Sequence, residues 1–233
     1  MISPLLANIY LHYVFDRWVD VWRKKCAWGD VIVVRYADDN VLGFQHLAEA
    51  DRFLAEFRDR LRKFGLELHP DKTRRIEFGR SAEVNRSQRG EGKPEAFDFL
   101  GFTHISGKDR KGSYARKRKT ISKRMRAKLL EIKQQLRRRM HEPVAQTGQW
   151  LRSVVQGYFN YHAVPGNIDS LSAFRYRVIR LWRSMLIHRG QKHNLTWERC
   201  ESWLIGGSRS RVFSIHTPEF ALTPFIQDKS LMR

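Results

Sequence analysis

Tyr36-Ala37-Asp38-Asp39 lies between two apolar runs, Val31-Ile32-Val33-Val34 before it and Val41-Leu42-Gly43-Phe44 after it. Val and Ile favour the extended backbone of a strand, whereas Asp tolerates the dihedral angles of a tight turn. The sequence therefore predicts a strand-turn-strand hairpin with its turn at the two acids. An adjacent Asp pair at a turn often bonds only to nearby backbone amides. On a rigid hairpin such a pair can also hold a hard divalent cation, which prefers carboxylate oxygen.

The segments around this hairpin predict an α+β arrangement. Apolar residues recur at helical spacing over residues 4–14 and again over 47–64, where Gly65 ends the pattern. Short runs at 66–69 and 75–78 predict a second, smaller hairpin, and the polar stretch 79–96 predicts a surface loop. The first 104 residues therefore read as a mixture of antiparallel strands and helices.

The second part of the chain is predicted to be helical. Three apolar stripes at helical spacing begin near Ile121, Trp150 and Ile168, and Pro143 and Pro165 separate them. This pattern predicts three antiparallel helices in a small bundle. We accordingly expect four regions: 1–104 around the hairpin, a basic linker at 105–120, the helical region 121–203, and a tail at 204–233.

Several segments resemble one protein family in order and spacing. They are Ser3-Pro4-Leu5-Leu6-Ala7-Asn8-Ile9-Tyr10-Leu11-His12, the Tyr-Ala-Asp-Asp hairpin preceded by Arg35, Gly65-Leu66-Glu67-Leu68-His69-Pro70-Asp71-Lys72-Thr73, Phe97-Asp98-Phe99-Leu100-Gly101-Phe102 and Gly157-Tyr158-Phe159-Asn160-Tyr161-His162. Together they are similar to the end of the palm, the thumb and the maturase region called domain X of group II intron reverse transcriptases. Asn40 departs from this pattern, because an apolar strand residue is expected after the acid pair.

The resemblance implies RNA-directed DNA synthesis, with two Mg²⁺ ions at the attacking and leaving oxygens of the reaction. It implies that Asp38 and Asp39 are catalytic metal ligands and that Tyr36 lies near the primer or nucleotide. By the same resemblance Lys72 contacts nucleotide phosphates, and Phe99, Leu100 and Gly101 belong to the primer grip. Two bland alternatives stay open: Lys72 is an exposed turn lysine, and the aromatic residues at 97–102 belong to a buried strand.

The chain begins at the helix before the hairpin, whereas the family places a third catalytic Asp on an earlier palm strand. No strand-borne substitute is evident in the sequence, since Asp16 and Asp20 fall on a predicted helix and Asp30 at a strand entrance. We expect those three acids to be solvated or capping residues. We therefore expect that the chain alone does not polymerise and that a complementing amino-terminal half would be needed.

Positive charge is concentrated in the second part of the chain. Residues 1–104 hold 17 Lys and Arg against 16 Asp and Glu, whereas residues 105–233 hold 27 against 8. Such a one-sided field is typical of proteins that bind nucleic acid. The candidate contact residues are Arg116, Lys117, Arg118, Lys119, Lys123, Arg124, Arg137, Arg138, Arg139, Arg175, Arg180 and Arg183. The expected partners are group II intron RNA and an RNA template with its DNA primer.

Composition excludes several other classes. The sequence has no uncharged apolar run of membrane-spanning length and no signal peptide, so we expect a protein of the bacterial cytoplasm or an organelle matrix. Two cysteines, Cys26 and Cys200, indicate neither a disulfide framework nor a zinc finger. Two rival hypotheses stay open: a non-catalytic basic nucleic-acid-binding protein, and a degenerate remnant of a polymerase.

Overall fold

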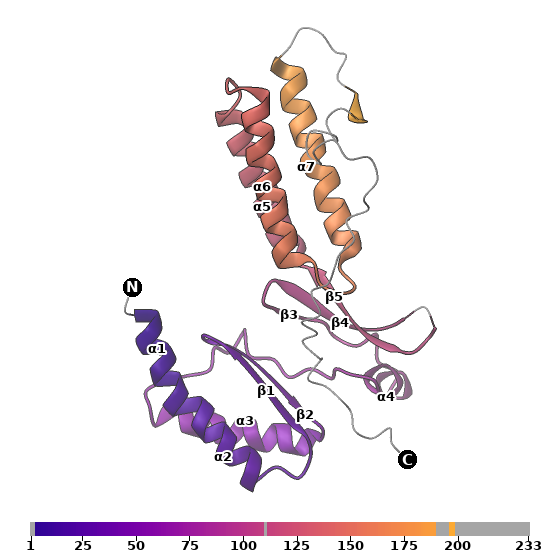
Figure 1. The fold of residues 1–233 in the computed structure, drawn as a ribbon. Coiled ribbons are helices and arrows are strands. Elements are labelled where there is room, and N and C mark those ends of the chain that lie inside the picture. Colours follow the sequence, from indigo (N-terminus) through magenta and orange to yellow (C-terminus); the bar gives the residue numbers. More distant parts are fainter. Residues whose placement is uncertain (1–2, 110, 190–195, 199–233) are drawn as a thin grey trace. The chain divides into compact units, whose positions relative to one another are not determined.

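The computed structural model describes residues 3–109, 111–189 and 196–198 (Figure 1). The described chain is α+β and forms two compact units that divide after Ile76. The predicted tail at 204–233 lies outside the described residues. None of the described helices is both long enough and apolar enough to cross a lipid bilayer.

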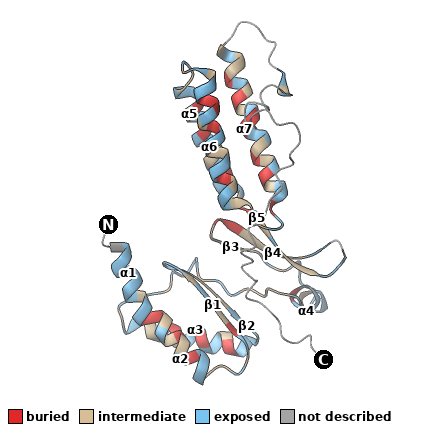
Figure 2. Ribbon diagram, in the orientation of Figure 1, coloured by how far each residue is buried: buried red, intermediate tan, exposed pale blue. Residues whose placement is uncertain are grey.

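The first unit begins with a helical segment that contains one π-helical turn. Its parts are α1 (Ser3–Leu11), the π-helix η1 (His12–Asp16) and α2 (Arg17–Lys25). Buried residues occur in η1 and α2, whereas α1 is exposed along most of its length (Figure 2). The core of the unit therefore starts at Val14 and Phe15, each only 1% exposed.

The predicted hairpin is present as β1 (Val31–Tyr36) paired antiparallel with β2 (Asp39–Phe44). Its inner face packs against α2 and against α3 (Leu47–Arg62), through a cluster that includes Val31, Trp22 and Phe53. A lone hairpin is only marginally stable in water, so this helical packing is what holds it. Buried Glu49 fixes the approach to β1, because its Oε1 accepts bonds from the backbone N–H groups of Trp28 and Gly29 at 2.7 and 3.2 Å.

Two predictions about the middle of the chain are wrong. The runs at 66–69 and 75–78 do not form a hairpin, because no strand is assigned to either run in the described structure. The expected loop at 79–96 contains the helix α4 (Ala82–Gln88), whose Ala82 is 2% exposed. A helix of seven residues that buries one small side chain leaves too weak an apolar pattern to be predicted.

The second unit contains a three-stranded antiparallel sheet in the order β3-β4-β5. Its strands are β3 (Phe97–Phe99), β4 (Phe102–Lys108) and β5 (Tyr114–Thr120). The region expected to be a basic linker at 105–120 is therefore mostly strand. Lys and Arg are uncommon in strands, and they conceal the alternation that buries Thr120 at the end of β5.

The predicted three-helix bundle is formed by α5 (Ser122–Arg138), α6 (Val144–His162) and α7 (Ile168–Arg189). Its core includes Leu151, Phe174 and Trp182, each 0% exposed. Fully buried Asn167 joins the sheet to the bundle. Its Oδ1 accepts the N–H of Thr120 at 2.9 Å, and its Nδ2 donates to Thr120 Oγ1 and to the carbonyl of His162 at 2.8 and 2.9 Å.

Candidate active-site hairpin and nucleic-acid interface

The turn of the β1–β2 hairpin lies one residue earlier than predicted. Tyr36 pairs with Asp39, so the two turn residues are Ala37 and Asp38, and Asp39 is the first residue of β2. Ala37 has a φ of 54°, in the left-handed region that normally favours glycine. For a residue with a Cβ this conformation costs roughly 1–2 kcal/mol.

The Arg35 side chain joins the turn to the first helical segment. Its Nη1 donates to the carbonyl of Ala37 and to Asn8 Oδ1 of α1, both at 2.9 Å. Its Nε and Nη2 donate to the two carboxylate oxygens of Asp16, each at 2.7 Å. The Arg35 side chain is only 16% exposed, so these charge-assisted bonds are partly shielded from water.

The sequence suggested that Asp16 is a solvated or capping acid. In the structure its carboxylate is instead paired with Arg35. The guanidinium of Arg35 holds the pKa of the Asp16 carboxyl below its usual value, and the Asp16 carboxylate in turn raises the pKa of Arg35. Asp16 is the last residue of the π-helical turn. Such turns are frequent at functional sites, since they rotate the following side chains relative to ordinary helical spacing.

Asn40, the residue that departs from the family pattern, also bonds to the turn. It is paired with Arg35 in the hairpin register, and its Nδ2 donates to the carbonyl of Asp38 at 3.3 Å. The side chains of the paired residues Arg35 and Asn40 thus donate to the carbonyls of both turn residues. The polar residue at this position therefore has a local structural role.

The carboxylates of Asp38 and Asp39 are both exposed, and neither is in a salt bridge within the described chain. Exposed, adjacent carboxylates on a fixed hairpin suit a hard cation such as Mg²⁺ as two of its ligands. Across the described ranges, however, no group of three or more His, Cys, Asp or Glu is placed to hold a metal ion. The two acids fit part of a metal site rather than a complete one.

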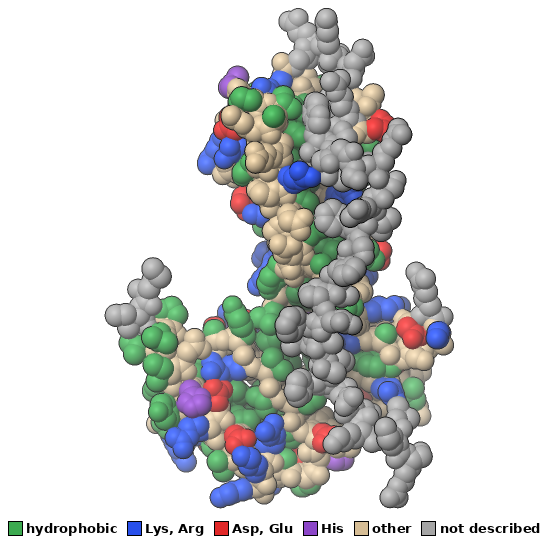
Figure 3. All heavy atoms as spheres, in the orientation of Figure 1, with side chains coloured by type: hydrophobic (Ala, Val, Ile, Leu, Met, Phe, Trp, Pro, Cys, Tyr) green, Lys and Arg blue, Asp and Glu red, His purple; other side chains and the backbone are tan. Residues whose placement is uncertain are grey.

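The outer face of the hairpin is apolar and uncovered within its unit. Val34 is 42% exposed and Tyr36 is 63% exposed, and both strands have a free edge, because the sheet has only two strands. The exposed side of α1 adds Leu5, Leu6, Ile9 and Tyr10, and η1 adds Tyr13, with exposed fractions from 43% to 62%. Figure 3 shows hydrophobic side chains gathered over α1. Exposed apolar surface and open strand edges of this kind can pair with another chain.

The predicted primer-grip residues form a second tight turn. Leu100 and Gly101 connect β3 to β4, with φ values of 48° and 84°. Positive φ at both positions is the requirement of the type I′ turn, which normally excludes a residue such as Leu. Tyr161 of α6 donates its hydroxyl to the Leu100 carbonyl at 2.9 Å, and Phe102 beside the turn stacks on the Tyr161 ring.

Lys72 lies in a turn in which the N–H groups of Lys72 and Thr73 donate to the carbonyl of His69. Its side chain is exposed, as the bland alternative for this residue requires.

The four basic residues of β5 lie on two different faces of the sheet. Arg118 pairs with His104 and Arg116 with Ser106 on one face, whereas Lys117 and Lys119 alternate with them on the other. Lys117 and Lys119 are exposed, and the two arginines are half-buried. Burial and the nearby charges of Arg116 and Arg118 lower the pKa of His104. Of these four residues, only the two lysines are exposed.

Basic residues on α5 form a true stripe. Lys123, Arg126, Lys133 and Arg137 are exposed, and helical geometry places them within about 80° of arc over about 21 Å. Arg138 and Arg124 are also exposed, about 60° and 100° around the helix from the Lys123 edge of this stripe, and none of the six is in a salt bridge. The sequence prediction omitted Arg126 and Lys133, although their spacing from Lys123 indicates the shared face.

Arg139, predicted to contact nucleic acid, interacts with other residues of the chain. Its Nη1 pairs with Glu142 at 2.8 Å, and its guanidinium lies over the ring of Trp150 at 4.9 Å. The run Arg137-Arg138-Arg139 therefore does not act as one basic patch.

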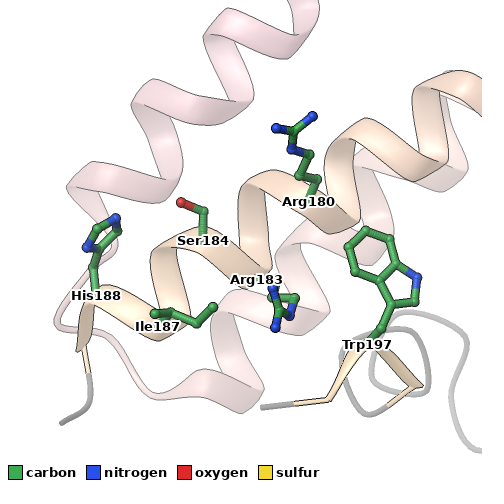
Figure 4. A pocket seen from close by; sticks show the side chains of 6 residues that line it. All are labelled: Arg180, Arg183, Ser184, Ile187, His188 and Trp197. Atoms are coloured by element: carbon green, nitrogen blue, oxygen red, sulfur yellow. The ribbon is translucent and has the colours of Figure 1, made fainter. Parts of the chain in front are cut away.

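On α7, Arg180 is exposed, and Arg175 and Arg183 are partly buried. Arg180 and Arg183 line a hollow of about 200 Å³ together with Ser184, Ile187, His188 and Trp197 (Figure 4). All six lining residues belong to α7 or to the short described segment 196–198.

Comparison with known families agrees with the hairpin. Residues 1–104 match the family model described as reverse transcriptase (RNA-dependent DNA polymerase). A search of curated proteins found no match to the chain. The match covers the β1–β2 hairpin and ends within β4, so it does not extend to the helical bundle.

Proposed function

We propose that this chain, whose first 104 residues match the reverse transcriptase model, carries the Tyr-Ala-Asp-Asp part of a group II intron reverse transcriptase/maturase together with its RNA-binding thumb and domain X. The observation that carries the proposal is the hairpin itself. Asp38 in the turn and Asp39 directly after it are both exposed, and the carbonyls of the two turn residues accept bonds from Arg35 and Asn40.

In this proposal Asp38 and Asp39 supply carboxylate ligands to Mg²⁺, which when bound lowers the barrier for attack of a primer hydroxyl on a nucleotide phosphate. Tyr36 borders the acids on the exposed outer face of the hairpin and offers its ring to the primer or nucleotide. The turn Leu100–Gly101 backs the primer end, and Lys72 contacts phosphate.

A complementing amino-terminal polypeptide is part of the proposal. It would supply a third carboxylate and a strand beside the hairpin. The free strand edges, the exposed Val34 and Tyr36, and the exposed apolar side of α1 support such a partner. Removing one carboxylate contact of this kind is expected to lower the rate about 10²- to 10³-fold.

Primer extension on an RNA template tests this proposal. The purified chain is assayed alone, with a family amino-terminal half, and with Asp38→Ala in each case. Extension only after complementation, abolished by Asp38→Ala, is the expected result. Extension by the chain alone, abolished by Asp38→Ala, would show that the chain holds its own third ligand. No extension in either arm would remove the polymerase part of the proposal.

A second candidate function is non-catalytic nucleic-acid binding. The observation that favours it is the α5 stripe, which needs no carboxylate and lies outside the region that matches the polymerase model. Competition between a folded group II intron and a random duplex of equal length separates the two functions. A maturase prefers the intron, whereas a general binder does not discriminate between them. Rapid proteolytic loss of residues 1–104 from the purified chain would instead indicate a degenerate remnant.

A further inference from the structure

Among the described residues, Ala37 and Leu100 are the two non-glycine residues with positive φ, at 54° and 48°. One lies in the turn that carries Asp38, and the other in the turn next to Gly101. In both cases the backbone carbonyl of the strained residue accepts a hydrogen bond of 2.9 Å from a side chain: Arg35 Nη1 for Ala37 and the Tyr161 hydroxyl for Leu100.

From this coincidence we infer that Arg35 and Tyr161 are positioning residues, which hold the two turns in strained conformations that the local sequence would not keep by itself. The inference rests on the proposed function only for its consequence, which is the placement of the Asp38 carboxylate and of the primer-grip turn. Neither side chain is assigned a chemical role.

The contacts around Arg35 explain why it can hold a turn. The side chain is fixed at three points: the bidentate pair with Asp16, the bond to Asn8 and the bond to Ala37. Its forked donor geometry meets all three at once, which a lysine cannot do. Since Asp16 and Asn8 belong to the first helical segment, Arg35 fixes the turn relative to that segment.

Tyr161 acts from the end of α6 on the β3–β4 turn. Its ring is stacked on Phe102, the residue that follows the turn, with a centroid distance of 6.0 Å and an interplanar angle of 14°. Although the residue is 54% exposed, its hydroxyl is directed by this stacking to the Leu100 carbonyl. The backbone of Gly101 is further held by a bond from the Ile121 N–H to its carbonyl at 3.2 Å.

Hydrogen–deuterium exchange of the full chain tests the inference without any requirement for activity. Arg35→Lys is expected to speed amide exchange of residues 36–39 about tenfold, and Tyr161→Phe that of residues 99–102 about three- to tenfold. The matched controls are Arg52→Lys, whose partner Glu56 lies on the same helix, and Tyr10→Phe, which removes a hydroxyl bond to the Phe64 carbonyl. Neither control is expected to change exchange at the two turns.

Glycine gives the decisive second variant, because it adopts positive φ without strain. Ala37→Gly combined with Arg35→Lys is expected to return exchange at residues 36–39 to within about threefold of the parent, and Leu100→Gly is expected to do the same for Tyr161→Phe. A side chain that merely stabilises its unit would speed exchange throughout the unit and would not be rescued by glycine. That result, or unchanged exchange at the turns, would overturn the inference.

If Arg35→Lys does not fold, Ala37→Gly is introduced first and the Lys variant is compared in that background. Near-parent exchange there supports the inference, and failure to fold even with glycine overturns it. Primer extension with the complementing half is measured in parallel, where Arg35→Lys is expected to lower kcat about tenfold or more. If the unsubstituted protein shows no extension but the turns respond as stated, the proposed function fails while the positioning roles stand.

Discussion

Neutralising the α5 stripe should change the salt dependence of nucleic-acid binding by a calculable amount. The variant replaces Lys123, Arg126, Lys133 and Arg137 by Ala, the best helix former, at four exposed positions without salt bridges. Each lost phosphate contact lowers the slope of log K against log salt by about 0.7 for a single strand and about 0.9 for a duplex. Four contacts therefore lower it by about 3 to 4.

The same arithmetic gives the change in affinity. Six unpaired basic residues of α5 predict that binding weakens about 300-fold between 50 and 200 mM salt on a single strand, and the two that remain in the variant predict about sevenfold. Fluorescence anisotropy with a labelled RNA over this range measures both slopes. The other basic residues contribute equally to both proteins, so the difference in slope is the quantity to compare.

A charge-matched control isolates the stripe from net charge. Lys24, Arg52, Arg62 and Arg75 are exposed and paired with Asp20, Glu56, Asp59 and Asp51. Replacing these four by Ala removes the same total charge, but should leave the slope within about one unit of the parent. An equal fall in both variants would show that the field of the whole chain, rather than a located stripe, binds the nucleic acid. An unchanged slope in the stripe variant would refute phosphate contact by α5.

Three further predictions concern stability. Arg35 lowers the pKa of Asp16, so their ion pair stabilises the first unit fully above the ordinary Asp pKa of 3.8, and this stabilisation is lost as pH falls through the lowered pKa. In urea titrations from pH 5 downward, the free energy of unfolding should therefore fall less steeply for Asp16→Asn than for the parent. Burial lowers the pKa of His104 and His162, so the second unit should lose stability as pH falls from about 6.5 towards the lowered pKa values. Thermal melts should show a smaller loss for His162→Gln. A pH profile of the melting temperature that is the same for the variant and the parent would contradict this prediction. A Cβ added at Gly148 would lie 2.9 Å from Cη2 of buried Trp182, so Gly148→Ala should destabilise the bundle by about 1–3 kcal/mol. The control is Gly157→Ala, because a Cβ added there has no such neighbour within 4 Å. Equal denaturation midpoints for the two variants would argue against crowding at Gly148.

The features that the sequence predicts well depend on local patterns. The β-branched runs around Asp38 predicted the hairpin, and the apolar stripes predicted α5, α6 and α7. The turn was misplaced by one residue because its position depends on bonds from Arg35 and Asn40 to turn carbonyls, not on the preference of Asp for turns. In β5, four consecutive basic residues hid a strand pattern. The structure reveals it through the pairing of Thr120 with Phe102 and the bonds between Thr120 and Asn167.

The sequence did not predict the contacts of the candidate site that are made between residues far apart in the chain. Asp16 and Arg35 are 19 positions apart, and a π-helical turn directs Asp16 to its partner, which ordinary helical spacing does not predict. Tyr161 and Leu100 are 61 positions apart and meet only after the sheet and bundle have formed. The one available signal was Arg35 itself, a charged residue in a strand whose other inner positions are apolar.

In both turns a strained residue is held by a side-chain hydrogen bond. A left-handed Ala or Leu costs roughly 1–2 kcal/mol, which one hydrogen bond of ordinary strength, about 1 kcal/mol, largely offsets. A bond to a charged guanidinium, worth about 1.5–3 kcal/mol, can exceed that cost. The Ala37 turn should therefore be the firmer of the two, and the Leu100 turn, which has only a neutral tyrosine hydroxyl, should open first. If the proposed polymerase function holds, the turn that carries Asp38 would need to be rigid, whereas the turn that backs the primer end could be more flexible.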